Sequence, residues 1–184
     1  MTDAQFEECL ARIRNKDKSG LKEIYEAYVA FIFHVVLDIV KNRESAEDIT
    51  SDFFIKLWDK SDGYRPGGGH KGYMATIARN MAIDHIRKYK REELMGGVDD
   101  DDGPPDEIAS ASDDTASVEE GVVSELSVEQ ALAKLKPVYR QIVTMKVLSD
   151  MTFKEIASVL AMPMGTVTWN YREAINQLRR FGYD

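Results

Sequence analysis

The chain has little cysteine or histidine and no long apolar run. Its one cysteine, Cys9, cannot form an internal disulfide, and the histidines at 34, 70 and 85 are too scattered to form a zinc site with it. The longest apolar run, about residues 28–40, is too short and too interrupted to span a bilayer. The first twenty residues lack the charged start and apolar stretch of an export signal. We therefore expect a cytoplasmic protein without membrane insertion.

Strand signals and catalytic groupings are also missing. Apolar and polar residues do not alternate as they do in strands, so we predict an all-α fold. The sequence contains no Ser-His-acid grouping, glycine-rich phosphate loop or metal-ligand spacing. Asp99 to Asp102 lack the alternate spacing and the glycine of a calcium loop. The expectation is a protein that is not an enzyme and that needs no metal or cofactor.

A basic majority is missing as well, since the net charge is −8. This charge argues against a nucleic-acid partner, because phosphate contacts need lysine and arginine. However, residues 92–124 carry twelve acidic and no basic side chains. Residues 15–91 carry 14 basic against 11 acidic side chains, and residues 125–184 carry eight against six. Both flanking blocks are therefore mildly basic, and a nucleic-acid partner remains possible.

The acidic segment, residues 92–124, is rich in glycine, proline and serine and shows no helical or strand period over most of its length. This composition predicts a flexible linker between an N-terminal domain, 1–91, and a C-terminal domain, 125–184. Two interpretations of the linker stay open. It is a simple tether, or it shields basic DNA-binding faces in the free protein and moves into a basic channel of a partner.

Three helices are predicted in the first block. In residues 19–40, apolar side chains recur at spacings of three and four. A second helix is expected from Ser45, whose hydroxyl can cap backbone amides, to about Lys60. Pro66 and the three following glycines then force a loop. A third helix is expected over about residues 70–92.

The third helix combines an apolar arc with a polar stripe. Asn80, Asp84, Arg87 and Arg91 recur at spacings of four, three and four. Tyr73 near its start adds an aromatic ring, and single-stranded nucleic acid favours surfaces that combine cations with aromatic rings. A solvated charged face is the alternative interpretation. The apolar arc consists of Met74, Ile77, Ala78 and Met81.

The C-terminal block carries the sharpest local pattern. Ser127 to Gln130 and Thr152 to Glu155 match the capping box, and Pro137 suits a first helical turn. A short helix after Thr152, a turn around residues 162–165 and a longer helix from Thr166 predict a helix-turn-helix, whose second helix enters the major groove. A helix pair in an ordinary bundle is the alternative. The predicted shared core is Ile156, Ala157, Leu160, Val167, Ala174, Ile175 and Leu178.

These motifs together resemble the extracytoplasmic-function (ECF) sigma factors of bacterial RNA polymerase. The resemblance rests on the order and spacing of SAEDITSDFFIKLW, GYMATIARNMAIDHIRKYKR, the acidic segment and the TFKEIA and PMGTV parts of the helix-turn-helix, and it covers about residues 18–181. It implies a factor that binds core RNA polymerase and promoter DNA and directs promoter recognition and opening. An anti-sigma partner is implied as well.

The resemblance also assigns site residues. Polymerase-binding positions are Glu47, Asp48, Asp52, Phe54 and Trp58. Positions at the promoter's −10 element are Lys71, Tyr73, Arg79, Asn80, Arg87, Lys88 and Arg91. For the C-terminal domain the resemblance implies only that it reads the −35 element. The helix-turn-helix pattern itself makes Thr166, Thr168, Trp169, Asn170 and Arg172 available for the groove, where Asn and Arg can pair with adenine and guanine edges. Lys154, Arg179 and Arg180 suit phosphates. The chain departs from the family pattern in having Tyr73 and Met74 where a tryptophan is common, and Ser51 where glutamine is usual.

The expected mechanism needs no catalytic residue, because a protein that binds the opened strand better than the duplex favours opening. Two other functions remain open from the sequence. One is a free-standing helix-turn-helix regulator of the response-regulator type, although its phosphoacceptor domain would need strands that residues 15–91 lack. The other is a helical module that sequesters a partner without touching DNA. Co-purification with core polymerase separates the sigma interpretation from both.

Overall fold

The computed structural model describes residues 1–67, 69–94 and 128–182, without the side chains of 92–94, 128 and 129. These parts contain eight α-helices, one short 3₁₀ turn and no strand, which confirms the all-α prediction. The predicted linker lies almost wholly outside the described residues, as does Ser127 of the first predicted capping box. None of the described helices is long and apolar enough to cross a membrane.

Helix α1, Asp3–Arg14, was not among the predicted elements. It begins with a capping box, in which the Thr2 hydroxyl accepts from the Gln5 amide and the Gln5 side chain accepts from the Thr2 amide. Phe6 and Leu10 are buried on its inner face. Both the Thr2-x-x-Gln5 pattern and the apolar spacing were available in the sequence as signals for this helix.

Helix α2, Lys18–Val40, is central and contacts α1, α3, α4 and α6. Helix α3, Arg43–Asp59, begins two residues before the predicted start. The prediction of Ser45 as the cap is wrong, because the Asn42 side chain accepts from the Ser45 amide at 2.8 Å and Ser45 lies in the first turn. The end near Lys60 is confirmed, since Lys60 is the C-cap.

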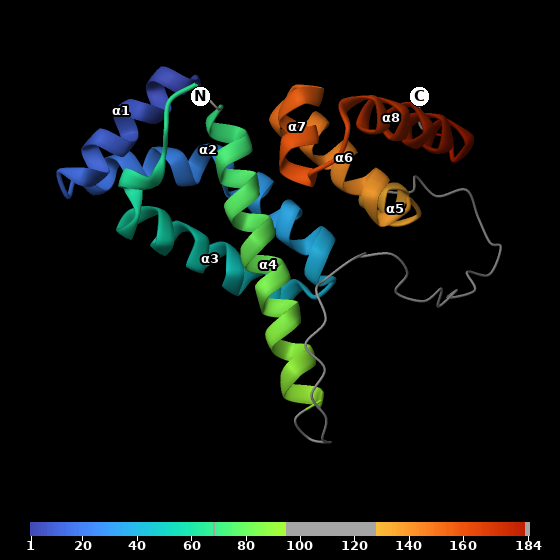
Figure 1. Ribbon diagram of the computed structural model, residues 1–184, viewed down its shortest axis with the longest axis horizontal. Helices are drawn as coiled ribbons and strands as arrows, with labels where there is room; N and C mark the ends of the chain where they lie inside the picture. The colour runs from blue at the N-terminus through green and yellow to red at the C-terminus, as the bar shows by residue number, and fades with distance from the viewer. Residues whose placement is uncertain (68, 95–127, 183–184) are drawn as a thin grey trace.

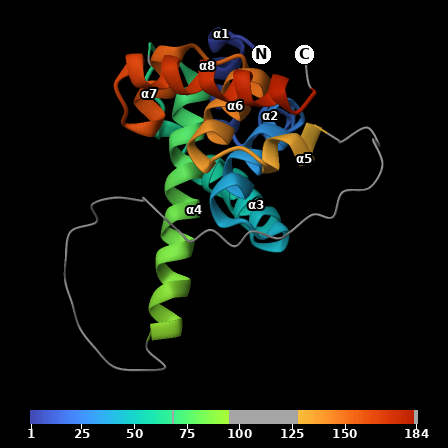
Figure 2. The same ribbon diagram turned by 90° about the vertical axis from the view of Figure 1, so that its right-hand side faces the viewer.

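A 3₁₀ turn at Ser61–Gly63 follows α3, and helix α4 spans His70–Leu94. The connection between them, described at residues 60–67 and 69, confirms the predicted loop. The first half of α4 packs on α2 and α3, whereas its second half extends beyond both of them (Figures 1 and 2). Much of the polar stripe therefore lies on a helix that projects from the body.

The C-terminal block contains α5 (Val128–Ala133), α6 (Pro137–Ser149), α7 (Phe153–Leu160) and α8 (Met164–Arg180). Pro137 occupies the first turn of α6, as predicted. The capping box of α7 is confirmed, since Thr152 and Glu155 bond each other's backbone amides. The chain turns at Ala161 in the left-handed conformation, and α8 begins two residues before the predicted start. The predicted helix-turn-helix is therefore present.

The two blocks pack against each other through α2 with α6 and α4 with α7 (Figure 1). One apolar cluster runs through both blocks. At its edge the Thr144 hydroxyl donates to the buried Asp38 carboxylate at 2.9 Å, and Arg140 Nε lies 3.8 Å from the same carboxylate. Burial raises the pKa of Asp38, although Thr144 and Arg140 oppose the shift. The N-terminal and C-terminal blocks therefore pack against each other, and we call this arrangement closed.

Candidate polymerase and nucleic-acid interfaces

The predicted polar stripe of α4 faces solvent. Asn80, Asp84, Arg87 and Arg91 are all exposed, and an ion pair of 3.7 Å joins Arg87 to Asp84. The apolar arc faces inward, with Met74 and Ala78 buried and Ile77 and Met81 half-buried. Lys88 is also exposed. The helical pattern therefore placed these side chains on the correct sides of α4.

The stripe is less uniform toward the start of α4. Lys71, Tyr73 and Arg79 are half-buried. Burial lowers the pKa of Arg79, and its buried Nε has no hydrogen-bond partner among the described residues. Only part of this guanidinium therefore faces solvent, so its exposed atoms are the ones that can meet a phosphate.

A small pocket of about 130 Å³ lies between α3 and the first half of α4. Phe53, Leu57 and Ile77 give it an apolar lining, and the exposed residues Lys56 and Lys60 also line it. The remaining lining comes from Gly63 and Tyr73. Only Tyr73 had been predicted as a site residue. A pair of lysines four residues apart beside core positions Phe53 and Leu57 was the available signal for the others.

The predicted polymerase-binding residues of α3 divide into two groups. Glu47, Asp48 and Asp52 are exposed, and the apolar Ile55 on the same side is 59% exposed. Phe54 was predicted to face the polymerase, but its ring is buried and contacts Tyr25 at 4.8 Å between centroids.

Trp58, the last of the predicted polymerase-binding residues, takes an intermediate position. It is half-buried, and Lys16 Nζ lies 5.6 Å from the centroid of its ring. Part of the indole therefore faces solvent.

Helix α8 lies on the outer side of the C-terminal block (Figure 1). Trp169 is 60% exposed, and Thr166 and Arg172 are also exposed. The prediction that Asn170 faces the DNA groove needs correction, since this side chain is buried. The Thr168 hydroxyl is half-buried and donates to the Met164 carbonyl at 2.9 Å. The candidate surface is therefore narrower than expected.

The cations predicted around the helix-turn-helix remain accessible. Lys154 in α7 and Arg179 and Arg180 in the last turn of α8 are exposed. Of the predicted shared core, Ile156 and Val167 are fully buried. Leu160 and Ala174 are buried, and Ala157, Ile175 and Leu178 are half-buried. The described residues contain no group of three His, Cys, Asp or Glu side chains placed to hold a metal ion.

Comparison with known families gives two matches in the same chain order as the helical blocks. Residues 24–92 match Sigma-70 region 2, and residues 125–178 match Sigma-70 region 4. The ECF RNA polymerase sigma factor SigW of Bacillus subtilis is 26% identical over 174 residues, covering 93% of each chain. The ECF RNA polymerase sigma factor SigK of Mycolicibacterium vanbaalenii is 23% identical over 185 residues, covering 98% of this chain and 90% of the relative.

Two solved structures share the fold. The sigma factor RpoE in complex with the anti-sigma factor NepR from Bartonella quintana has a TM-score of 0.60 at 21% identity, covering 86% of this chain and 94% of that one. CnrH in complex with the cytosolic domain of CnrY has a TM-score of 0.61 at 15% identity, covering 96% of both chains. At these identities the likeness concerns the fold alone.

Proposed function

The chain belongs to the ECF sigma factors, which carry RNA polymerase to promoters, and we propose that three of its surfaces divide this work. The first half of α4 and the pocket beside it bind the opened −10 strand. The outer face of α3 binds the polymerase. Helix α8 reads the −35 element. The pocket beside the exposed α4 stripe is the observation that carries the proposal.

The pocket supports strand binding through its chemistry. An unstacked base is flat and apolar on both faces, and it stacks well on aromatic or apolar side chains. Phe53 and Leu57 provide apolar walls, Tyr73 provides a ring, and Lys56 and Lys60 are placed to meet the flanking phosphates. A base bound in this pocket cannot pair with the other strand, so binding favours the open form of the promoter.

The outer face of α3 supports polymerase binding through its charge. Asp48 and Asp52 lie one turn apart and are exposed, with Ile55 beside them. An acidic face around one apolar side chain suits a basic helical partner surface, in which charge orients the partner and apolar contact adds affinity. Glu47 extends the acidic face, although Arg43 pairs with it at 2.9 Å.

The exposed side of α8 supports duplex recognition. Arg172 can donate two hydrogen bonds to a guanine edge, and Trp169 can contact a thymine methyl group. Arg179, Arg180 and Lys154 suit phosphates, which position the helix without reading sequence. Asn170 is omitted from this surface because it is buried.

The partners of this chain follow from the same assignment. Core RNA polymerase and promoter DNA are the partners that the function requires. One solved neighbour is the sigma factor RpoE bound to the anti-sigma factor NepR, which supports an anti-sigma partner for this chain as well. The chain would then act in the cytoplasm as a binding protein without chemistry of its own.

The division of labour is tested by separating recruitment from opening. Arg172→Ala should weaken recruitment to duplex promoter by about 1–3 kcal/mol for a lost base contact. Tyr73→Ala and Asn80→Ala should leave recruitment unchanged and reduce opening, as measured by permanganate footprinting of the holoenzyme. If holoenzymes with either variant opened the promoter normally, the assignment of α4 to the −10 strand would be wrong.

A further inference from the structure

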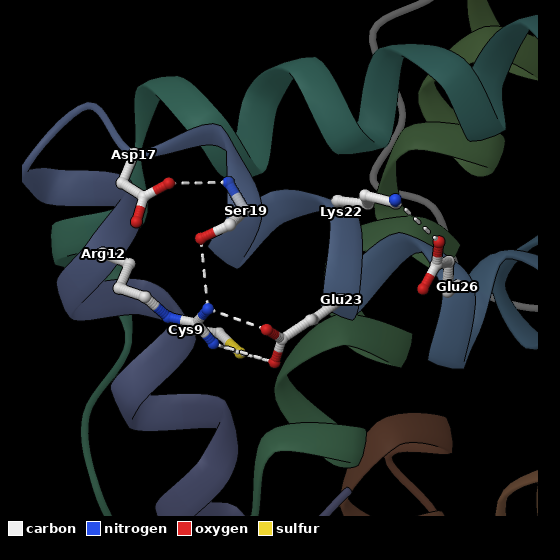
Figure 3. Close-up of polar contacts among 7 residues, drawn as sticks. All are labelled: Cys9, Arg12, Asp17, Ser19, Lys22, Glu23 and Glu26. Carbon is white, nitrogen blue, oxygen red and sulfur yellow. Dashed lines mark hydrogen bonds and ion pairs between the residues drawn. The ribbon is translucent and has the colours of Figure 1, made fainter.

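Helix α1 lies before residue 24, where the match to the family begins, and it is firmly attached to α2. The Arg12 guanidinium donates to both oxygens of Glu23, at 2.7 and 2.8 Å, and to the Ser19 hydroxyl at 3.1 Å (Figure 3). Leu10 and Ile13 are fully buried. Because buried core side chains hold α1 in addition to this ionic contact, α1 remains a fixed support for whatever its other side contacts even when the ionic contact is removed.

The other side of α1 holds the beginning of the α3–α4 connection. Arg14 donates from Nη2 to the Ser61 carbonyl at 3.3 Å, and its Nε lies 3.0 Å from the Asp62 carboxylate. The fully buried Phe6 ring meets the Tyr64 ring edge-on at 5.2 Å between centroids. Two side chains of α1 therefore fix two successive parts of the connection.

The same helix also holds the start of α4. Gly69 precedes α4 and has no side chain that could cap it. The Asp3 carboxylate accepts from the His70 backbone amide at 3.0 Å and also bonds His70 Nδ1. A carboxylate at this position accepts a hydrogen bond from a backbone amide that has no partner within the helix, and its negative charge interacts favourably with the positive end of the helix dipole. Asp3 thus caps α4 from a different helix.

These contact points adjoin, along the chain, residues that line the pocket assigned to the unstacked base. Lys60 and Gly63 of the connection line the pocket together with Tyr73 of α4. The Tyr73 hydroxyl lies close to Gly63, since a Cβ added there would be only 3.2 Å from it. Tyr64 contacts the Tyr73 ring edge-on at 5.3 Å. A shift of the connection relative to α4 would therefore change the shape of the pocket.

We propose that α1 is a positioning element for base capture, in which Asp3 and Arg14 hold the two sides of the pocket at the spacing that receives an unstacked base. The proposal rests on the proposed function, because it requires that the pocket takes a base. A connection that is ordered in advance loses no conformational freedom when the base enters, so binding is stronger. Asp3 and Arg14 act through Tyr73 and Lys60 and need not touch DNA themselves.

A purely structural role for Arg14 is disfavoured by its surroundings. Its partner Asp62 is 89% exposed, and exposed ion pairs contribute little to stability. Arg12, two residues earlier on the same helix, makes a stronger paired contact but faces α2 rather than the connection. Arg12→Ala is therefore a matched control, which weakens the attachment of α1 without removing a contact to the pocket.

The test uses holoenzyme reconstituted from core polymerase and the full chain. Fork-junction templates carry an abasic nucleotide at each −10 position in turn, and the dissociation constant of each complex is compared with that of the intact template. With the wild-type chain, loss of the captured base should weaken binding about tenfold or more at one position, as expected for a lost stacking contact.

Arg14→Ala and Asp3→Ala should reduce this position-specific penalty to about twofold or less and leave the other positions unchanged. Arg14→Lys should restore part of the penalty, and Arg12→Ala should keep all of it. If Asp3→Ala does not fold, Arg14→Ala alone tests the proposal, because the contact of Arg14 with Asp62 is exposed and its loss should not prevent folding.

Two failures are distinguishable. If no position shows a specific penalty with the wild-type chain, the pocket does not capture a base and the proposed function fails. If the wild-type penalty is present and Arg14→Ala retains it, or if Arg12→Ala and Arg14→Ala lose it equally, the proposed positioning role of α1 is overturned.

Discussion

His70 is a buried titratable group that contacts both α1 and α2. It is 3% exposed, stacks on Phe6 at 4.9 Å and bonds both Asp3 and the Tyr28 hydroxyl. Burial lowers the pKa of the imidazole from 6.5, although Asp3 opposes the shift. Lys71 and the amino terminus also face it and lower its pKa further. A neutral ring can donate a hydrogen bond from Nδ1 to Asp3 and accept one from the Tyr28 hydroxyl at Nε2.

This environment predicts the sign of an acid effect on stability. Because the pKa is lower in the folded chain, the unfolded chain binds a proton first as the pH falls below about 6.5. His70 should therefore reduce the free energy of unfolding by up to about 1.4 kcal/mol per pH unit in that range. Urea unfolding at pH 7 and pH 5.5 measures the loss, and His70→Gln should flatten it. An identical loss in both proteins would contradict the assignment.

Single side chains also show where sequence reasoning failed. Asn170 lies three residues after Val167 and four before Ala174, both of which were predicted as core. That spacing places it on the buried side of α8, and the structure confirms this. The error arose because asparagine was judged by its ability to bind adenine rather than by its position on the helix.

At the scale of elements, α3 illustrates what helical periodicity can and cannot reveal. Ile49, Phe53 and Leu57 recur at spacings of four, as core positions of a helix do, and all three are buried. The periodicity of α3 alone does not show that Tyr25 of α2 covers the neighbouring Phe54. The core of each predicted helix was therefore accessible to sequence reasoning, whereas the width of each buried face depends on which helices pack beside it.

The exposed face of α3 carries a prediction about the polymerase. Reversing Asp48 and Asp52 to lysine should weaken binding to core polymerase and leave the unfolding free energy within about 0.5 kcal/mol, because surface substitutions rarely change stability more than this. Glu44→Lys is the control, since Glu44 is exposed on the same helix in its first turn. Affinity equal to that of the wild-type chain, with the fold intact, would exclude this face.

At the scale of the whole molecule, the closed packing of the two blocks conflicts with promoter binding. The −10 and −35 elements lie about 25 base pairs, or about 85 Å, apart along the duplex. Blocks joined by the Asp38–Thr144 hydrogen bond and by α4 against α7 cannot reach both elements at once. We therefore expect polymerase binding to separate the blocks, with residues 95–127 as the covalent connection.

A wedge at Gly72 tests this expectation. A Cβ added there would lie 4.0 Å from Glu155 Cβ, so a leucine side chain would reach into α7 while raising the helix propensity of α4. Gly72→Leu should increase the radius of gyration of the free chain by small-angle scattering. Gly165→Leu is the control, because a Cβ at Gly165 meets no atom within 4 Å. Equal radii for all three proteins would show that this contact does not hold the blocks together.

The central claim is that the chain directs polymerase to promoters through α4 and α8. The most direct measurement is transcription in vitro with purified core polymerase, the full chain and a pool of promoter sequences. We predict transcripts that depend on the chain, arise from templates sharing two elements at fixed spacing, and decline with Tyr73→Ala and Arg172→Ala. Transcription that does not depend on the chain, or promoter binding by the chain alone with no effect on polymerase, would contradict the account.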